Sequence, residues 1–104
     1  MFVALWEYEV KPGSEERFET VYGPEGSWAK LFQWSRGYQG TRLLRDVARP
    51  RSYLTMDFWE TREEYEIFLM ERRKEYDALD RAGEEFTTQE KCAGYFQGIA
   101  IADQ

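Results

Sequence analysis

SYLTMDFWETREEYEIFL, the stretch Ser52–Leu69, decides the fold of this chain. Its first half, Tyr53–Glu60, is rich in aromatic residues and alternates between two faces, which predicts a strand. Its second half opens with Thr61 and has Glu64 three residues later, a capping box that predicts the start of a helix. The stretch is therefore expected to form a strand that runs directly into a helix.

The two faces of this strand differ in character. One is uniformly apolar and consists of Leu54, Met56 and Phe58. The other carries aromatic rings with polar tips, a hydroxyl and a carboxylate, from Tyr53, Thr55, Asp57 and Trp59. A surface strand would carry more charge on its second face, so we expect this face to line a cavity or to meet a partner.

The helix that starts at Thr61 is expected to continue to about Gly83. Large side chains recur at helical spacing and form one stripe, made of Tyr65, Phe68, Leu69, Arg72, Tyr76 and Leu79. Arg72 is the one charged member of this stripe.

Further alternating or amphipathic segments fill the rest of the chain. Strands are expected at Phe2–Val10, Gly37–Ala48 and Thr87–Ile101, and helical pieces at Glu15–Tyr22 and about Gly26–Trp34. The order β-α-β-β-α-β predicts an α+β, ferredoxin-like domain over residues 1–104, with an antiparallel sheet and the helices on one face. The apolar open face of such a sheet cannot remain in water, so it predicts a homodimer through that face.

Composition narrows the function classes. The formal net charge of −6 weighs against nucleic acid as a partner, since phosphate binding needs a basic surface. No apolar run is long enough to cross a membrane and no leader peptide is visible, and the single cysteine, Cys92, cannot form an internal disulfide. These features together predict a cytoplasmic protein. The aromatic content of 17% is high for one small core and predicts a ligand cavity or an aromatic interface.

Metal and cofactor chemistry have little support in the sequence. The chain has no histidine and one cysteine, so the residues that usually hold zinc are missing. Cys92 has no histidine to activate it as a nucleophile. We therefore expect no metal; the expectation that the protein also works without a cofactor comes from the family resemblance described next.

The chain resembles the antibiotic biosynthesis monooxygenase family of dimeric α+β barrels. The resemblance lies in the strand that ends at Phe58-Trp59, the following segment Glu60–Tyr65, the helix to Leu79, the turn Lys11–Gly13 and the glycine-rich last strand. It implies a homodimeric barrel that binds ligands between sheet and helices. It also implies an activity such as the cofactor-free oxidation of phenols and quinols.

One branch of the resembled family degrades haem and uses an asparagine, a tryptophan and a histidine. By spacing, those places hold Trp6, Phe68 and Ala78 here, and the chain contains neither histidine nor asparagine. The sequence therefore weighs against haem degradation.

Three residues are candidates for catalysis by a cofactor-free oxygenase. Arg72 and Tyr76 would orient a substrate oxygen, and Asp57 would act as a base if burial raises its pKa. Each also has a structural interpretation: Arg72 can pair with an acid at the helix edge, Tyr76 can be a core tyrosine, and Asp57 can pair with Arg42 or Arg45.

Trp6, Tyr8, Trp59 and Phe68 are candidates for the walls of the substrate site, although all four would also suit an ordinary aromatic core. The leading hypothesis is a cofactor-independent monooxygenase acting on a phenolic or quinol-like small molecule. The alternatives are a non-catalytic, dimeric small-molecule-binding protein and an isomerase or decarboxylase on the same barrel.

Overall fold

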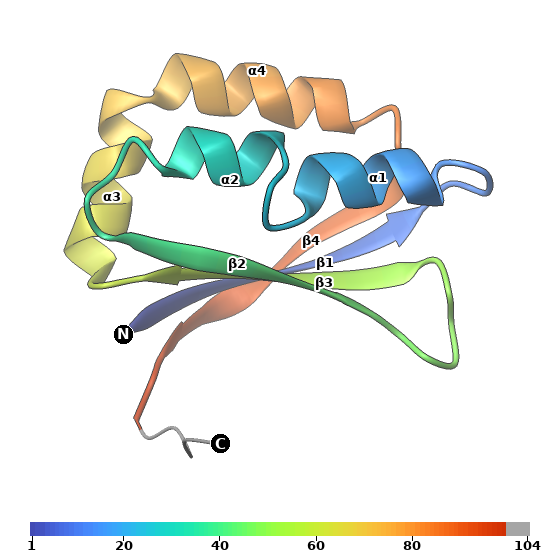
Figure 1. Ribbon diagram of the computed structural model, residues 1–104, viewed down its shortest axis with the longest axis horizontal. Helices are drawn as coiled ribbons and strands as arrows, with labels where there is room; N and C mark the ends of the chain where they lie inside the picture. Colours follow the sequence, from blue (N-terminus) through green and yellow to red (C-terminus); the bar gives the residue numbers. More distant parts are fainter. Residues whose placement is uncertain (100–104) are drawn as a thin grey trace.

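The computed structural model describes residues 1–99, and its helices and strands follow the expected order (Figure 1). The four strands are β1 (Phe2–Val10), β2 (Tyr38–Arg45), β3 (Ser52–Trp59) and β4 (Thr87–Gln97). The helices are α1 (Glu15–Tyr22), α2 (Ser27–Phe32), α3 (Arg62–Glu71) and α4 (Arg73–Gly83).

The strands form one antiparallel sheet in the order β2-β3-β1-β4. Figure 1 shows α1, α2 and α4 along one side of this sheet, with α3 at one end. This arrangement confirms the predicted ferredoxin-like α+β fold. It also leaves the opposite side of the sheet without any helix among the described residues.

The helix side of β3 is the more polar of its two faces. Tyr53, Thr55, Asp57 and Trp59 are 2%, 3%, 7% and 0% exposed. Met56 and its neighbours on the apolar face are partly exposed, because they lie on the open side of the sheet. The strand therefore buries a hydroxyl and a carboxylate beneath the helices and leaves its aliphatic side chains uncovered.

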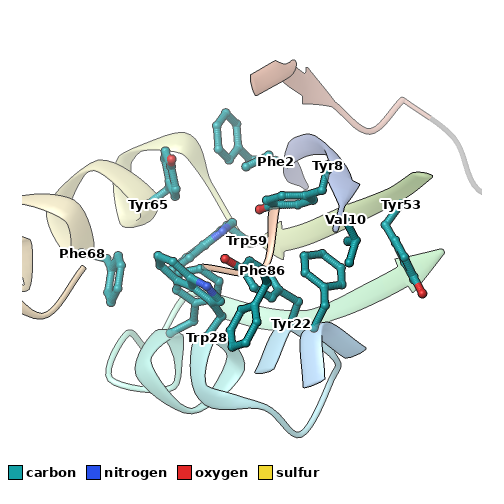
Figure 2. Packing of buried hydrophobic residues seen from close by; sticks show 13 residues of the cluster. Phe2, Tyr8, Val10, Tyr22, Trp28, Tyr53, Trp59, Tyr65, Phe68 and Phe86 are labelled. Carbon is teal, nitrogen blue, oxygen red and sulfur yellow. The ribbon is translucent and has the colours of Figure 1, made fainter. Parts of the chain in front are cut away.

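Aromatic rings dominate the layer between sheet and helices (Figure 2). The Trp59 ring lies 5.3–5.4 Å from four others, those of Phe32, Tyr38, Tyr65 and Phe68. A second group surrounds Phe18, whose ring stacks on Tyr22 at 4.2 Å and meets Tyr8 edge-on at 5.2 Å. The high aromatic content thus goes largely into the core, where such ring pairs add to the free energy of burial.

The expected continuous helix from Thr61 to Gly83 is wrong, since the helix breaks at Arg72. The backbone there leaves the helical region, with φ −119° and ψ 30°, and α4 starts at the next residue. The Arg72 guanidinium lies 4.0 Å from the Trp34 ring centre and 3.2 Å from Glu75. The break lets α4 turn away from α3 and run along the helix layer (Figure 1), which one straight helix could not do.

A regular alternation of side chains along the last strand is interrupted by a β-bulge. Leu5 pairs with Gly94 and Trp6 with Cys92, so Ala93 is an extra residue in β4. Alternation alone predicts Cys92 and Tyr95 on opposite faces, whereas the bulge places both on the helix side, because an inserted residue inverts the alternation. The expected end of this strand at Ile101 lies outside the described residues.

Smaller differences concern element ends. The helical piece expected to extend to Trp34 ends at Phe32, and the strand expected to extend to Ala48 ends at Arg45. None of the helices in residues 1–99 has the length and apolar character needed to cross a bilayer.

The capping box is confirmed in part, and it generates a stability prediction. The Thr61 side chain accepts a hydrogen bond from the Glu64 backbone N–H at 3.1 Å. We expect Thr61→Ala to lower the free energy of unfolding by about 1 kcal/mol, because that N–H loses its partner. Urea denaturation measures the change. Thr20→Ala, an exposed site within α1, is the control, and an equal loss in both variants would argue against the cap.

Candidate active site

A small pocket lies between the sheet and the helices, around the carboxylate of Asp57. Its lining comes from three strands and three helices and consists of Trp6, Tyr8, Tyr22, Trp28, Phe32, Thr55, Asp57, Tyr76, Asp80 and Glu90. The cavity holds about 20 Å³, which is room for about one water molecule. A larger ligand therefore enters only if lining side chains move.

Asp57 is the most buried acid of this pocket, with 7% exposure. Its Oδ1 accepts a 2.8 Å hydrogen bond from the Thr41 hydroxyl of the neighbouring strand. Burial raises the pKa of Asp57 to about 7, and the Thr41 hydrogen bond offsets only part of that rise. The carboxyl group is thus close to half-protonated near neutral pH.

The salt bridge considered for Asp57 does not form. Arg45 pairs instead with Glu19 at 3.6 Å, and Arg42 is exposed. Within residues 1–99 none of the ion pairs includes Asp57. The absence of a cation leaves desolvation as the dominant influence on its charge.

The rim of the pocket is formed by α4 and β4. Tyr76 meets the Trp28 ring edge-on at 5.0 Å, and burial raises the pKa of its phenol. Asp80 is partly exposed and Glu90 exposed. Partial burial of its carboxyl group against the pocket and the adjacent Asp80 carboxylate raise the pKa of Glu90 to about 7. These rim side chains have more freedom to move than the buried floor.

The structure brings four of the seven candidate residues together. Trp6, Tyr8, Asp57 and Tyr76 all line the pocket. Trp59 and Phe68 lie in the neighbouring aromatic core, with 0% and 2% exposure, and do not line the pocket. A role of either residue as a wall of the substrate site stays a prediction.

Arg72 lies outside the pocket lining. Its side chain is 34% exposed, and it contacts Trp34 and Glu75 near the surface. The part of the pocket described here contains no Lys or Arg. A role of Arg72 toward a substrate stays a prediction, and this geometry adds no support for it.

Several residues in or beside the pocket were not among the sequence candidates. Thr41, the hydrogen-bond donor to Asp57, belongs to β2, and its pairing opposite Asp57 depends on a strand register that only the structure gives. Asp80 and Glu90 come from segments with an ordinary surface composition. Thr55 did carry a signal, because it shares the polar face of β3 with Asp57.

A larger groove of about 390 Å³ lies away from Asp57, at the open side of the sheet and the β2–β3 hairpin. Its charged groups already have partners among the described residues, such as Arg49 with Asp46 at 3.4 Å. Lys91 lies 4.0 Å from Glu7, and Ser52 donates to Glu9 at 2.6 Å. The groove belongs to the face that we expect a second copy of the chain to cover, so we do not assign it as the active site.

The raised pKa of Asp57 generates a prediction about stability. The unfolded chain loses this proton near the ordinary value of 3.8, whereas the folded chain keeps it up to about pH 7. Between these two pH values the folded state binds a proton that the unfolded state has lost. The free energy of unfolding therefore decreases as pH rises through this interval, by roughly 4 kcal/mol in all. We expect Asp57→Asn to remove most of this loss, since the amide oxygen of the substituted side chain would still accept from Thr41 without a charge.

Urea denaturation at pH 5 and pH 8 measures this effect. Asp77→Asn serves as the control, because the Asp77 side chain is 48% exposed and pairs with Arg73. An unchanged difference between the two pH values in Asp57→Asn would show that Asp57 does not carry the buried proton.

Comparisons with known proteins identify the family to which the chain belongs. Residues 1–72 match the sequence model of the antibiotic biosynthesis monooxygenases. A search of curated proteins finds no match.

Several solved structures have the same fold. SnoaB, described as a cofactor-independent oxygenase from Streptomyces nogalater, is similar with a TM-score of 0.76 at 18% identity, over 99% of this chain and 97% of that one. A protein of Deinococcus radiodurans, provisionally assigned as an antibiotic biosynthesis monooxygenase, has a TM-score of 0.77 at 13% identity, over 100% and 99% of the two chains. The family model matches more than half of the chain, so the chain belongs to the antibiotic biosynthesis monooxygenase family.

Proposed function

We propose that the protein is a cofactor-independent monooxygenase that acts on a small phenolic or quinol-like molecule. The observation that carries this proposal is a buried carboxylate, Asp57, in an aromatic pocket between sheet and helices. Family membership supports an oxygenase, and SnoaB is a fold relative described as cofactor-independent. The substrate class rests on the chemistry of the pocket.

Asp57 acts as the general base in this proposal. A phenol has a pKa of about 10, so proton transfer to an ordinary carboxylate of pKa about 4 is uphill by roughly 8 kcal/mol. With the pKa of Asp57 at about 7, the difference falls to roughly 4 kcal/mol. A base with a pKa near the working pH is the efficient choice.

The remaining pocket residues bind and orient the substrate. Trp6, Tyr8 and Trp28 offer ring faces to an aromatic substrate, and the Tyr76 hydroxyl donates to one of its oxygens. Deprotonation makes the ring electron-rich, and the substrate itself supplies the electrons that reduce oxygen. One oxygen atom enters the product and the other leaves as water. Exclusion of water protects the reactive anion.

The charge of the pocket favours a neutral phenol over an acid. Asp57, Asp80 and Glu90 all carry carboxyl groups, and no cation lines the described pocket. A carboxylate on the substrate would be repelled, whereas a neutral hydroxyl donates to Asp57. Proton transfer moves one negative charge from Asp57 to the substrate, so the net charge of the pocket stays constant.

Oxygen uptake by chelator-treated protein, measured with a panel of hydroquinones and polyphenols, tests this function. We expect uptake that scales with protein and rises with pH through about 7 as Asp57 ionises. Asp57→Asn should lower the rate by about 100-fold or more, since general-base catalysis is lost. Asp77→Asn is the surface control. Glu90→Gln shows whether the pH dependence comes from Asp57 or from Glu90, whose pKa is also raised to about 7.

The two alternative functions predict different results in the same assay. Quenching of tryptophan fluorescence by a panel compound without oxygen uptake would favour a non-catalytic binding protein. Substrate conversion under nitrogen would favour an isomerase or decarboxylase. Either result would overturn the monooxygenase proposal.

We propose further that the protein is a homodimer through the open face of the sheet. Phe96 and Leu44 on this face are 52% and 44% exposed, beside the partly exposed Met56. Met56→Glu should give monomers, because it places a charge in an interface that excludes water. Light scattering coupled to gel filtration measures the mass. The control is Met70→Glu on α3, where the methionine is 78% exposed, and a wild type that elutes as a monomer would exclude the dimer.

A further inference from the structure

A chain of three hydrogen-bonded side chains leads away from the pocket. The Tyr38 hydroxyl lies 2.6 Å from the Thr41 hydroxyl, and the Thr41 hydroxyl donates to Asp57 Oδ1 at 2.8 Å. Thr41 and Asp57 are buried, with 9% and 7% exposure, whereas Tyr38 is partly exposed. The chain therefore connects the buried carboxyl group with a residue that reaches the surface of the protomer.

The hydrogen bonds of this chain have one direction while Asp57 is ionised. A carboxylate can only accept, so the single Thr41 proton is committed to Asp57. The Thr41 oxygen must then accept from the Tyr38 hydroxyl. In this arrangement a proton can pass from Tyr38 through Thr41 to Asp57. Once Asp57 is protonated, each hydrogen bond can take the opposite direction, and a proton can pass outward.

A β-bulge in β2 brings these groups to one side of the sheet. Residues 38 and 41 are three apart, and in a regular strand their side chains would point to opposite faces. Tyr38 pairs with Trp59 and Gly40 with Phe58, so Gln39 is an extra residue. Gly40 has φ +135°, a conformation that favours glycine. The insertion turns Tyr38 to the face of Thr41.

The ring of Tyr38 is held in place by two neighbours. Its centroid lies 5.4 Å from that of Phe32 and 5.3 Å from that of Trp59. These contacts come from α2 and from the end of β3, so they fix the ring from two elements. The position of the hydroxyl against Thr41 is thus built into the core rather than left to a mobile surface side chain.

Every titratable group near Asp57 is an acid or a phenol. They come from all the elements packed around it and are Tyr8 on β1, Tyr22 on α1, Tyr38 on β2, Tyr65 on α3, Tyr76 and Asp80 on α4, and Glu90 on β4. None of these is a cation that would hold Asp57 ionised. Of these groups, Tyr38 is linked to Asp57 through a continuous pair of hydrogen bonds.

We propose that Thr41 and Tyr38 carry protons between Asp57 and solvent. After Asp57 has taken a proton from a ligand, its O–H bond breaks as a new O–H bond forms on Thr41. The Thr41 proton passes to Tyr38, and the Tyr38 proton passes to a water molecule. Three O–H bonds break and three form, and the net result is one proton released to water and an ionised Asp57.

This inference rests on the proposed function only in taking Asp57 as the base that must be reset between turnovers. A ligand that fills the pocket covers Asp57 from the helix side. A path through the sheet neighbour Thr41 would still be open then, because it lies outside the pocket lining. Neither Tyr38 nor Thr41 lines the pocket, so both act on a bound ligand only through Asp57.

The test follows Asp57 itself and needs no substrate. The carboxyl band of Asp57 is recorded by infrared spectroscopy after a rapid pH jump across pH 7, with Asp57→Asn identifying the band. We expect Tyr38→Phe to keep the fold and to slow the relaxation by about tenfold or more, because the last carrier is missing. A small carboxylic acid added to the buffer should restore part of the rate, which a purely structural role would not allow.

Two further variants sharpen the result. Tyr53→Phe is the matched control, because its hydroxyl faces the same side of the sheet but donates to Glu19 at 2.5 Å. Thr41→Ser should relax as the wild type does, since it keeps the hydroxyl. A Tyr38→Phe relaxation equal to that of Tyr53→Phe would overturn the relay. If no compound supports oxygen uptake but Tyr38→Phe still slows the relaxation of Asp57, only the proposed function is overturned.

Discussion

The burial of one indole, that of Trp59, is the interaction on which the rest of the structure depends. Its side chain is 0% exposed, and its neighbours come from α2, β2 and α3. It stands where β3 becomes the loop into α3, so it fixes both the end of the strand and the start of the helix. The same ring supports Tyr38, and through it the hydrogen bonds that reach Asp57.

Asp57 shows a compromise between stability and chemistry. A carboxylate under an aromatic layer costs free energy, and a leucine there would give a more stable core. The fold reduces this cost with one hydroxyl donor and by letting the group keep its proton near neutral pH. A group that changes charge so readily in a dry site is of little use to stability, and this is why it is the strongest candidate for function.

Much of the fold could be predicted from sequence, because local patterns control it. Alternation along the strand gives the two faces of β3, and the pair Thr61 and Glu64 gives the cap. The spacing of apolar residues gives the order of elements along the chain. The bulges at Gln39 and Ala93 could not be predicted, since alternation does not reveal an inserted residue. The break at Arg72 was hidden for a similar reason: the apolar spacing continues across it. Side-chain patterns pointed to Trp6, Tyr8, Asp57 and Tyr76 of the pocket, whereas the contact of Thr41 with Asp57 depends on the register between strands.

The break at Arg72 also divides the pocket into two parts that differ in how well they can accept amino-acid substitutions. The family match ends at residue 72, and this first part of the chain supplies the floor with Asp57 and the aromatic walls. The rim residues Tyr76, Asp80 and Glu90 come after the break. Because α4 is a separate helix, substitutions on its inner side can reshape the entrance while α3 keeps its packing on Trp59. In the proposed enzyme, engineering of α4 can thus change the entrance while Asp57 and the side chains that support it stay the same.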